Sequence, residues 1–412
     1  MESLKLSLDS QKILNEHLRE LDIAHDTISI NGTSRPGENF CGIINYITVN
    51  SQKPLHLVIK TAPDNPIIRK AYPIHEMYET EQHFYTYILP ELSKLQKEHK
   101  IQHPFISLPK LYKANLEEGK EVIVLEDMTK SGFETKNLLK TVDYDHAVCV
   151  IRQYGRLHAL SFALKVYKPN IFEKIKRNTS THILERFNYD ETRLANYKQR
   201  MDAILKCVDK NEDKVAYETF LKFSEQIVNV IKKVVNTDRA GEHAVLTHCD
   251  GWISNFMFKY ENSSVPTSVC FLDWQLAHFG SPALDLSFFI FACTSEAFRK
   301  NHYKDLIQEY YKSLSKSLAE FGLEAETIFP FTVLEEHLKK FSAYGLFMCL
   351  LVLNVTLLQG KGVPGTLSTQ LKMGSAGIPQ PPDAEDYKLY CSRMRGILLD
   401  FANFGFEVEF TT

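Results

Sequence analysis

The chain has 412 residues, of which 44% are hydrophobic and 24% are charged, and its formal net charge is −3. A chain of this length exceeds one ordinary hydrophobic core, so we expect two lobes in a globular protein. The near-neutral charge, with Lys and Arg scattered along the sequence, argues against a nucleic-acid partner.

The cysteines and the apolar runs indicate where the protein resides. The Cys residues lie between Cys41 and Cys391 without a CxxC pair or a His/Cys cluster, which favours reduced thiols over disulfides or structural zinc. Residues 1–6 include an acidic residue and no long apolar core, so we expect no secretory signal. The apolar run 344–358 contains Asn354 and is shorter than the roughly 20 residues of a spanning helix. We therefore predict a cytoplasmic protein without a membrane span.

Residues 1–128 predict a small β-rich lobe. Apolar residues recur at helical spacing near residues 14–21. A helical run at residues 75–89, ending near Pro90, lies between the third and fourth of the expected strands. The expected strands are residues 27–30, 40–49, 55–60, 111–114 and 122–125. This order of elements is that of a small kinase N-lobe.

Residues 129–412 predict a larger, mainly helical lobe. The helical periodicity is clearest at residues 147–164, where apolar side chains form one stripe. A segment rich in Gly, Ser and Pro at residues 360–386 is typical of a loop. Further helices are expected at residues 217–235, 303–321, 333–358 and 387–401. Together, the two halves predict an α+β chain with two lobes.

The most informative segment of the helical half is His-Cys-Asp-Gly-Trp-Ile-Ser-Asn at residues 248–255, followed by Phe-Leu-Asp-Trp-Gln at residues 271–275. Short apolar runs precede and follow both segments, which predicts a loop between two strands and then an Asp at the end of a further strand. This pattern is that of kinase-type phosphotransferases.

In that pattern, each polar residue has a distinct role. We expect Asp250 to accept a proton from a hydroxyl group, and Asn255 with Asp273 to hold Mg²⁺ against ATP phosphates. His248 would orient the loop rather than react. The alternative interpretation is a plain polar turn; a zinc site is a poorer alternative, because no third ligand follows at zinc spacing.

Two residues of the β-rich half complete the expected nucleotide site. Lys60 ends an apolar strand and could reach the α- and β-phosphates with its side chain packed on the sheet. Glu81, on the following helix, would hold the Lys60 ammonium in place. The alternatives are an ordinary strand-end Lys and a surface Glu, and Glu76 and Glu79 compete for the role of Glu81.

Three weaker candidates also concern the nucleotide. Asn39 lies in the loop of residues 37–42, which could cover the phosphates with backbone N–H groups or could be a plain hairpin loop. Glu126 and Met128 follow the fifth strand, where backbone groups would meet the adenine edge of ATP if this junction is a hinge. An ordinary strand-to-loop turn is the alternative for both residues.

Asp285 precedes an apolar helical run and has two compatible interpretations: it could cap that helix, or it could brace the catalytic loop from beneath. The aromatic residues of the helical half could line an apolar acceptor pocket, although such residues are more often core. They include Trp252, Phe288, Phe289, Phe291, Tyr344 and Phe347.

The motifs together resemble the ecdysteroid kinase-like family, also described as CHK-type kinase-like proteins, which are relatives of choline kinases and aminoglycoside phosphotransferases. The matching segments are residues 37–40, 58–63, 81–85, 89–92, 124–128, 157–159, 248–255 and 272–275. The resemblance implies a bilobal protein-kinase-like fold and ATP- and Mg²⁺-dependent phosphorylation of a small-molecule hydroxyl. It assigns Lys60 and Glu81 to ATP, Asp250 to proton acceptance, and Asn255 and Asp273 to magnesium.

Two positions depart from the family pattern. Cys249 stands where Gly is common, and Trp274 replaces the usual Phe after the metal-binding Asp. Neither change removes a reacting group. Cys249 nevertheless raises a question about the geometry of the loop, because Gly permits backbone angles that Cys does not favour.

The acceptor is less well defined by the motifs. The resemblance implies an ecdysteroid or another apolar steroid or xenobiotic. One alternative is a pseudokinase or ligand-binding protein, against which the intact Lys60, Asp250, Asn255 and Asp273 argue. Another is a kinase for a cationic acceptor such as choline or an aminoglycoside, which would need acidic residues or an aromatic cage. A protein kinase is disfavoured, because no APE-type activation segment follows Asp273.

Overall fold

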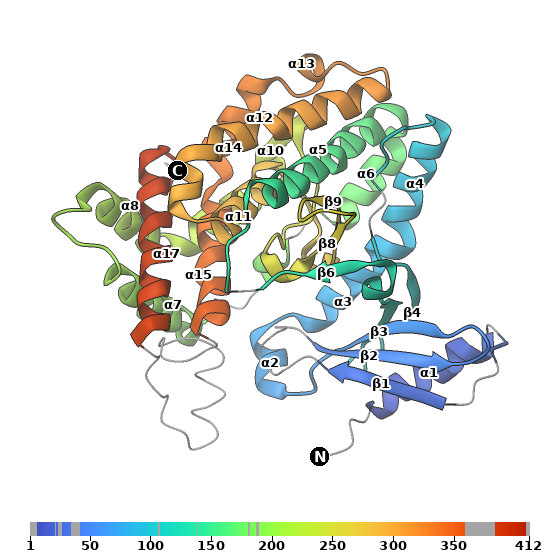
Figure 1. The fold of residues 1–412 in the computed structure, drawn as a ribbon. Helices are drawn as coiled ribbons and strands as arrows, with labels where there is room; N and C mark the ends of the chain where they lie inside the picture. Colours follow the sequence, from blue (N-terminus) through green and yellow to red (C-terminus); the bar gives the residue numbers. More distant parts are fainter. Residues whose placement is uncertain are drawn as a thin grey trace.

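The fold is α+β and bilobal, as in kinase-like proteins, with a small β-sheet lobe below a larger helical lobe (Figure 1). The computed structural model describes residues 6–20, 22–23, 27–33, 42–105, 108–137, 139–179, 182–186, 189–358 and 384–408. The candidate Asn39 and most of the predicted loop at residues 360–386 lie outside these residues. The division of the chain after residue 128 stays a prediction.

The N-lobe contains a five-stranded antiparallel sheet in the order β1-β2-β3-β5-β4, which confirms the five predicted strands. Helix α1 (Leu8–Glu20) packs its apolar face, with Leu14 and Leu18, against buried side chains of the sheet. β-branched residues are frequent in β1, β2, β3 and β5, as a half-buried sheet favours. The strands are β1 (Thr27–Thr33), β2 (Ile43–Asn50), β3 (Leu55–Thr61), β4 (Leu111–Asn115) and β5 (Val122–Glu126).

The connection between β3 and β4 begins with α2 (Pro66–Ala71) and then forms one long helical segment. The segment consists of α3 (Ile74–His83), the π-helical turn η1 (Phe84–Ile88) and α4 (Leu89–Glu98). The prediction that the helix ends near Pro90 is therefore wrong. Pro90 stands in the first turn of α4, directly after the π-turn, where its missing N–H is tolerated.

Helices make up most of the C-lobe, and the predicted helix at residues 217–235 is in fact two helices. The chain leaves helical geometry at Gln226, where φ is −120°, so that the apolar faces of α8 and α9 both reach the core. The helices are α5 (Tyr144–Tyr167), α6 (Pro169–Asn178), α7 (Glu191–Leu205), α8 (Lys214–Glu225), α9 (Ile227–Val234), α10 (Thr237–Ala240), α11 (Ala283–Cys293), α12 (Glu296–Glu320), α13 (Ala325–Ile328), α14 (Phe331–Phe341), α15 (Ala343–Leu358) and α17 (Ala384–Asn403).

Two small sheets lie beneath the helices and carry the motif region. β7 pairs with β10, and β6, β8 and β9 form a three-stranded antiparallel sheet. Short helical turns adjoin them at η2 (Met128–Ser131), η5 (Ile253–Asn255) and η6 (Trp274–Leu276). The strands are β6 (Phe133–Thr135), β7 (Val245–Thr247), β8 (Phe256–Tyr260), β9 (Pro266–Phe271) and β10 (His278–Gly280).

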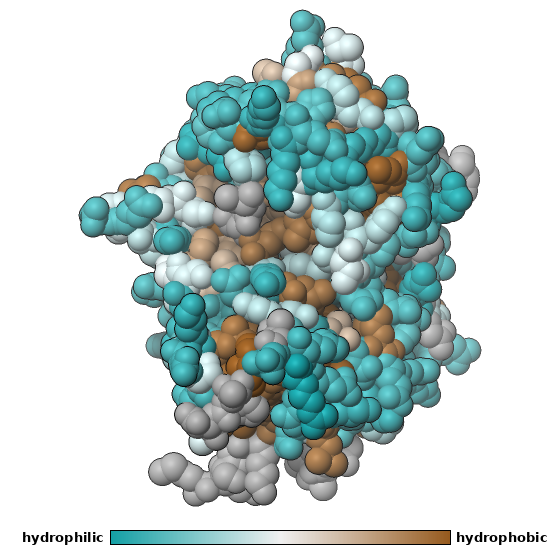
Figure 2. Space-filling model, turned by 90° about the vertical axis from the view of Figure 1, so that its right-hand side faces the viewer, coloured by the Kyte–Doolittle hydropathy of each residue, from teal (hydrophilic) through white to brown (hydrophobic). Residues whose placement is uncertain are grey.

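The main core lies in the C-lobe around α11, every residue of which is buried. The aromatic residues considered for an acceptor pocket, from Trp252 to Phe347, all belong to this core. Polar side chains dominate the face of the molecule in Figure 2, and apolar side chains show mainly in a recess across its middle and in smaller patches. Within the described residues, no single helix has the length and hydropathy to cross a membrane. Only when α14 and α15, which meet at a bend of 49°, are taken together do they reach that length and hydropathy.

Helices α11 and α15 approach closely at Gly345. A Cβ atom at this position would lie 2.5 Å from the backbone carbon of Ser287. We predict that Gly345→Ala lowers the free energy of unfolding by roughly 2 kcal/mol or more, because rigid backbone must move to admit the methyl group. Denaturant unfolding measures the change. Lys304→Ala, on the exposed face of α12, is the control and should change stability by less than about 0.5 kcal/mol. Equal stability of wild type and Gly345→Ala would contradict this packing.

Candidate active site

A buried lysine joins the two lobes. Lys60, on β3, is only 5% exposed, and its Nζ atom donates to Glu81 Oε2 at 2.6 Å and to Asp273 Oδ1 at 2.6 Å. Glu81 lies on α3 and is buried, whereas Glu79 is exposed and pairs with His75. Asp273 follows β9 of the C-lobe. Of the competing glutamates, it is Glu81 that contacts the lysine.

Charge keeps this lysine ionised despite its burial. Burial alone would lower the pKa of Lys60, but the adjacent Asp273 and Glu81 carboxylates outweigh it and hold the pKa well above its usual value. Burial raises the pKa of the Glu81 carboxyl group, although the Lys60 ammonium opposes this effect. The ammonium is therefore a fixed positive charge between carboxylates that come from both lobes.

The catalytic-loop segment begins after β7 and has an unusual backbone conformation. Cys249 is fully buried and has φ of 61°, in the left-handed region that favours glycine. Asp273 has a similar φ of 63°. The other non-glycine residues with positive φ in the described chain, Asp22, Lys100 and Asn262, lie in exposed positions. Cys249 therefore adopts the backbone conformation that the glycine common at this position would adopt more easily.

The surrounding structure holds Cys249 in this conformation. The Asp285 carboxylate, on α11, accepts the backbone N–H of His248 at 2.9 Å and that of Cys249 at 2.7 Å. The Tyr344 hydroxyl, on α15, donates to the Cys249 carbonyl oxygen at 2.6 Å. Because a left-handed non-glycine residue costs about 1–2 kcal/mol, these buried contacts are what stabilise the strained turn.

Asp285 therefore braces the loop, as one of its two interpretations predicts, and does not cap α11. Ser281 performs the capping, since its hydroxyl accepts the N–H of Ala283 at 3.1 Å. Asp285 Oδ2 also lies 3.0 Å from Nε2 of His158, on α5. The carboxylate contacts donors from two other segments, and none of its described hydrogen bonds goes to its own helix.

Gln275 links the two aspartates of the motif. Its Nε2 atom donates to Asp250 Oδ2 at 3.2 Å and to Asp273 Oδ2 at 3.1 Å, while its Oε1 atom lies 3.4 Å from Lys60 Nζ. Asp250 is only 5% exposed, so burial, with the nearby Asp273 charge, raises its pKa well above the usual value. Gln275 was not predicted as a site residue; the only sequence signal for it is its position two residues after Asp273.

The side-chain amide of Asn255 is hydrogen-bonded to the Asp250 segment. Its Nδ2 atom donates to the Asp250 carbonyl oxygen at 2.9 Å, which fixes the amide orientation, while Oδ1 lies 3.3 Å from the Ser254 hydroxyl. The N–H of Leu272 donates to the Asn255 carbonyl oxygen at 2.9 Å. Asn255 directly precedes β8 and Asp273 follows β9, so both residues lie at the same end of this antiparallel pair.

These donors fit a magnesium ion better than a metal held by protein alone. No group of three or more His, Cys, Asp or Glu side chains suited to a metal occurs in the described part of the chain. Asn255 and Asp273 offer hard oxygen atoms, and Mg²⁺ characteristically takes one or two such protein ligands together with water and substrate phosphates. The residues present thus suit the cation that the sequence predicts.

His248 positions the loop through its ring. Its Nε2 atom lies 2.8 Å from the Leu272 carbonyl oxygen, and burial lowers its pKa, so the ring is neutral and donates this bond. The His248 and Trp274 rings pack edge to face with their centroids 4.7 Å apart. Trp274 also stacks on Phe84 of η1, with ring centroids 3.7 Å apart. The indole that replaces the usual Phe therefore connects the loop with the helix that carries Glu81.

An apolar cluster lies between the predicted hinge and Asp273. Met128 packs with Phe133, Met257 and Cys270, and Leu272 adjoins this cluster. Glu126, at the end of β5, donates its N–H to the Lys110 carbonyl oxygen. Met257 and Cys270 were not predicted as site residues, because alternation along β8 and β9 shows which side chains are buried but not what they face.

The bracing role of Asp285 can be tested with an isosteric change. Asp285→Asn puts an amide NH₂ where the carboxylate accepts N–H groups, so we predict a loss of roughly 2–3 kcal/mol of stability. Denaturant unfolding measures the change. Asp202→Asn, at an exposed position on α7, is the control and should differ from wild type by less than about 0.5 kcal/mol. Indistinguishable unfolding curves for Asp285→Asn and wild type would contradict the bracing role.

Several solved structures match this chain at low sequence identity. The GDP and kanamycin complex of APH(2")-IIia is 12% identical, with a TM-score of 0.40, over 80% of this chain and 98% of that chain. The apoenzyme of macrolide 2'-phosphotransferase MphH from Brachybacterium faecium is 13% identical, with a TM-score of 0.38, over 90% and 98% of the two chains. The GDP complex of wild-type aminoglycoside 2'-phosphotransferase-IIIa is 12% identical, with a TM-score of 0.42, over 92% and 97%.

The sequence itself determines the family. No curated protein matches this chain. The ecdysteroid kinase-like family matches it over residues 36–323, a span that is more than half of the chain and includes Lys60, Glu81, Asp250, Asn255 and Asp273. The chain therefore belongs to the ecdysteroid kinase-like family.

Proposed function

We propose that the protein is an ATP- and Mg²⁺-dependent kinase that phosphorylates a hydroxyl group of a small molecule. The observation that carries the proposal is the buried ammonium of Lys60, held at 2.6 Å by both Glu81 and Asp273. Glu81 orients the buried Lys60 ammonium, and Asp273 lies beside it. Together with Asp250 and Asn255 of the catalytic-loop segment, these residues supply the groups that phosphoryl transfer needs. Membership of a kinase-like family supports the same conclusion.

The roles of the cluster follow from its charges. Lys60 would bind the α- and β-phosphates, and Glu81 would keep its ammonium in place. Asn255 and Asp273 would hold Mg²⁺, which when bound supplies neutralising charge for the phosphates. Asp273 now forms an ion pair with Lys60, so a nucleotide phosphate would compete with this carboxylate for the ammonium.

Asp250 would serve as the base for the acceptor. As the acceptor oxygen bonds to the γ-phosphorus of ATP, the bond from that phosphorus to the bridging β-phosphate oxygen breaks and ADP leaves. The acceptor O–H bond also breaks, and the Asp250 carboxylate receives the proton. The raised pKa of Asp250 favours this role, because a more basic carboxylate accepts a proton more readily. The side-chain amide of Gln275 donates to the Asp250 carboxylate, and that of Asn255 donates to the Asp250 carbonyl oxygen, so both hold Asp250 in place. His248 would act by positioning the loop.

The nucleotide base would lie against the apolar cluster of Met128, Met257, Cys270 and Leu272. This cluster connects the strand end at Glu126 to the residue before Asp273. An apolar cluster at the end of a strand suits the flat face of adenine. Asn39 remains a candidate contact to the phosphates.

For the acceptor, we propose an ecdysteroid or another apolar steroid or xenobiotic alcohol. Family membership is the support for this choice. The large aromatic residues of the C-lobe give none, because they form the main core. Choline and aminoglycosides are the cationic acceptors that the test must include.

The test uses labelled ATP with Mg²⁺ and a panel of an ecdysteroid, an uncharged xenobiotic alcohol, choline and kanamycin. We expect wild-type protein to transfer label to an uncharged alcohol. Asp250→Asn should reduce transfer by at least about 10²-fold, because it removes the base, while nucleotide affinity measured by calorimetry stays unchanged. Asp202→Asn, the exposed control, should retain wild-type transfer.

Each other outcome has a definite meaning. Labelling of choline or kanamycin alone would overturn the proposed acceptor class but not the kinase. Wild-type transfer by Asp250→Asn would overturn the role of Asp250. Nucleotide binding without any transfer to the panel or to a tissue extract would favour the pseudokinase alternative.

A further inference from the structure

A second polar site lies where α5 and α12 pack against each other. Gly155 of α5 permits this close approach, since a Cβ atom there would lie 2.8 Å from Ser313 Cβ and 2.9 Å from the Tyr310 carbonyl oxygen. The Ser313 hydroxyl also donates to the Arg152 carbonyl oxygen at 2.7 Å. With the two backbones this close, the side chains at the rim of the contact emerge beside one another.

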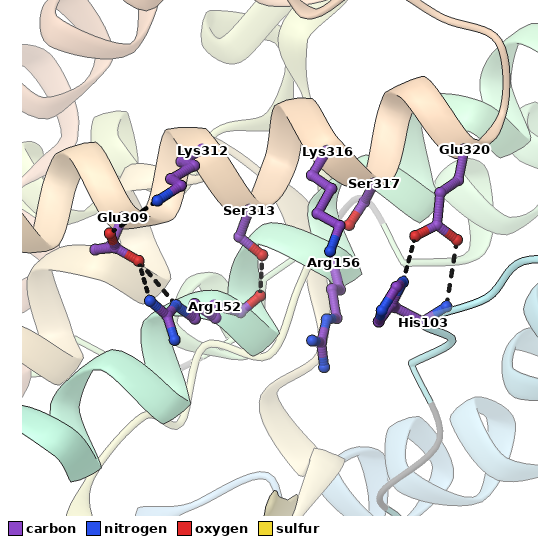
Figure 3. A pocket seen from close by; sticks show the side chains of 9 residues that line it. All are labelled: His103, Arg152, Arg156, Glu309, Lys312, Ser313, Lys316, Ser317 and Glu320. Carbon is purple, nitrogen blue, oxygen red and sulfur yellow. Dashed lines mark hydrogen bonds and ion pairs between the residues drawn. The ribbon is translucent and has the colours of Figure 1, made fainter. Parts of the chain in front are cut away.

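Four cationic side chains line this rim. Arg152 and Arg156 are one turn apart on α5, and Lys312 and Lys316 are one turn apart on α12, so each pair repels along its own helix. They line a pocket of about 260 Å³ (Figure 3). The full lining is His103, Arg152, Arg156, Glu309, Lys312, Ser313, Lys316, Ser317 and Glu320.

The two carboxylates of the pocket already have partners. Glu309 Oε2 accepts from Arg152 at 2.8 and 2.6 Å, and its other oxygen lies 3.7 Å from Lys312 Nζ. Glu320 accepts the N–H groups of Gln102 and His103 at 2.7 and 3.2 Å, and its Oε1 atom lies 2.7 Å from the His103 ring. Glu320 thereby ties α12 to the segment between α4 and β4.

Arg156 and Lys316 are left without a carboxylate. Arg156 donates to the neutral amide of Gln153 at 2.9 Å, and neither cation forms an ion pair among the described residues. In Figure 3 the Lys316 side chain points toward Arg156. Four cations against two carboxylates leave an excess of two positive charges, with His103 counted as neutral. Burial also lowers the pKa of Arg156, although the nearby Glu320 carboxylate opposes this effect.

We propose that this pocket binds a phosphate group, with Arg156 and Lys316 as its principal ligands. A dianionic tetrahedral oxyanion matches the excess charge, and the planar guanidinium of Arg156 offers paired N–H donors to it. The volume is below the roughly 300–1,000 Å³ of pockets for drug-sized ligands, which favours inorganic phosphate or a small phosphate monoester over a nucleotide. The pocket shares no residue with the candidate active site, so this inference does not depend on the proposed function.

The test is calorimetric titration with inorganic phosphate and, separately, with glycerol 3-phosphate, each at constant ionic strength set with chloride. We expect wild-type protein to bind at least one of them. Arg156→Gln and Lys316→Gln should each weaken that binding by at least about tenfold, because each removes a charge-assisted hydrogen bond. Lys304→Gln, an exposed position on the same helix, is the control and should leave the affinity unchanged.

The two ligands distinguish the source of the phosphate group. Binding of inorganic phosphate alone identifies the free ion, whereas equal or tighter binding of glycerol 3-phosphate identifies a monoester. Without ligand, Arg156→Gln should keep or raise the thermal midpoint, since it relieves like-charge repulsion. Equal affinity of wild type and both pocket variants, or no binding of either compound, would overturn the proposal.

Discussion

One buried ammonium determines how the two lobes meet. Lys60 from the sheet, Glu81 from the connecting helix and Asp273 from the C-lobe form a single charged cluster with very little solvent access. Removing one partner of such a buried pair typically costs about 3–5 kcal/mol, because the remaining charge is left uncompensated. The cluster therefore fixes the position of the sheet relative to Asp273, and with it the geometry in which nucleotide and cation would bind.

The second constraint is backbone strain in the loop, which buried hydrogen bonds stabilise. Cys249 and Asp273 both have left-handed backbone angles. Cys249 directly precedes Asp250, and Gln275 donates hydrogen bonds to both Asp250 and Asp273. Asp285 holds the amide side of the Cys249 turn and Tyr344 its carbonyl side. Both supporting residues lie on helices of the main core, so the packing of α11 and α15 is transmitted directly to the loop.

Much of this could be predicted from the sequence, because the signals are local. Alternating apolar residues located all five strands of the sheet, and the order of motifs paired Lys60 with Glu81. Other features depend on tertiary contacts that no short pattern encodes. The helix continues past Pro90 through a π-turn, and the helix expected at residues 217–235 breaks at Gln226 so that both halves reach the core. The bridging position of Gln275 likewise becomes visible only when β9 is placed beside the loop.

We propose that Asn255 and Asp273 hold one divalent cation beneath Lys60. The most direct measurement is a crystal structure with Mn²⁺ and a non-hydrolysable ATP analogue, in which anomalous scattering locates the metal. We expect an ion bound to oxygen atoms of Asn255 and Asp273 at about 2.0–2.3 Å, with analogue phosphates on Lys60. A metal and nucleotide bound elsewhere, with Lys60 still paired to Asp273, would contradict it.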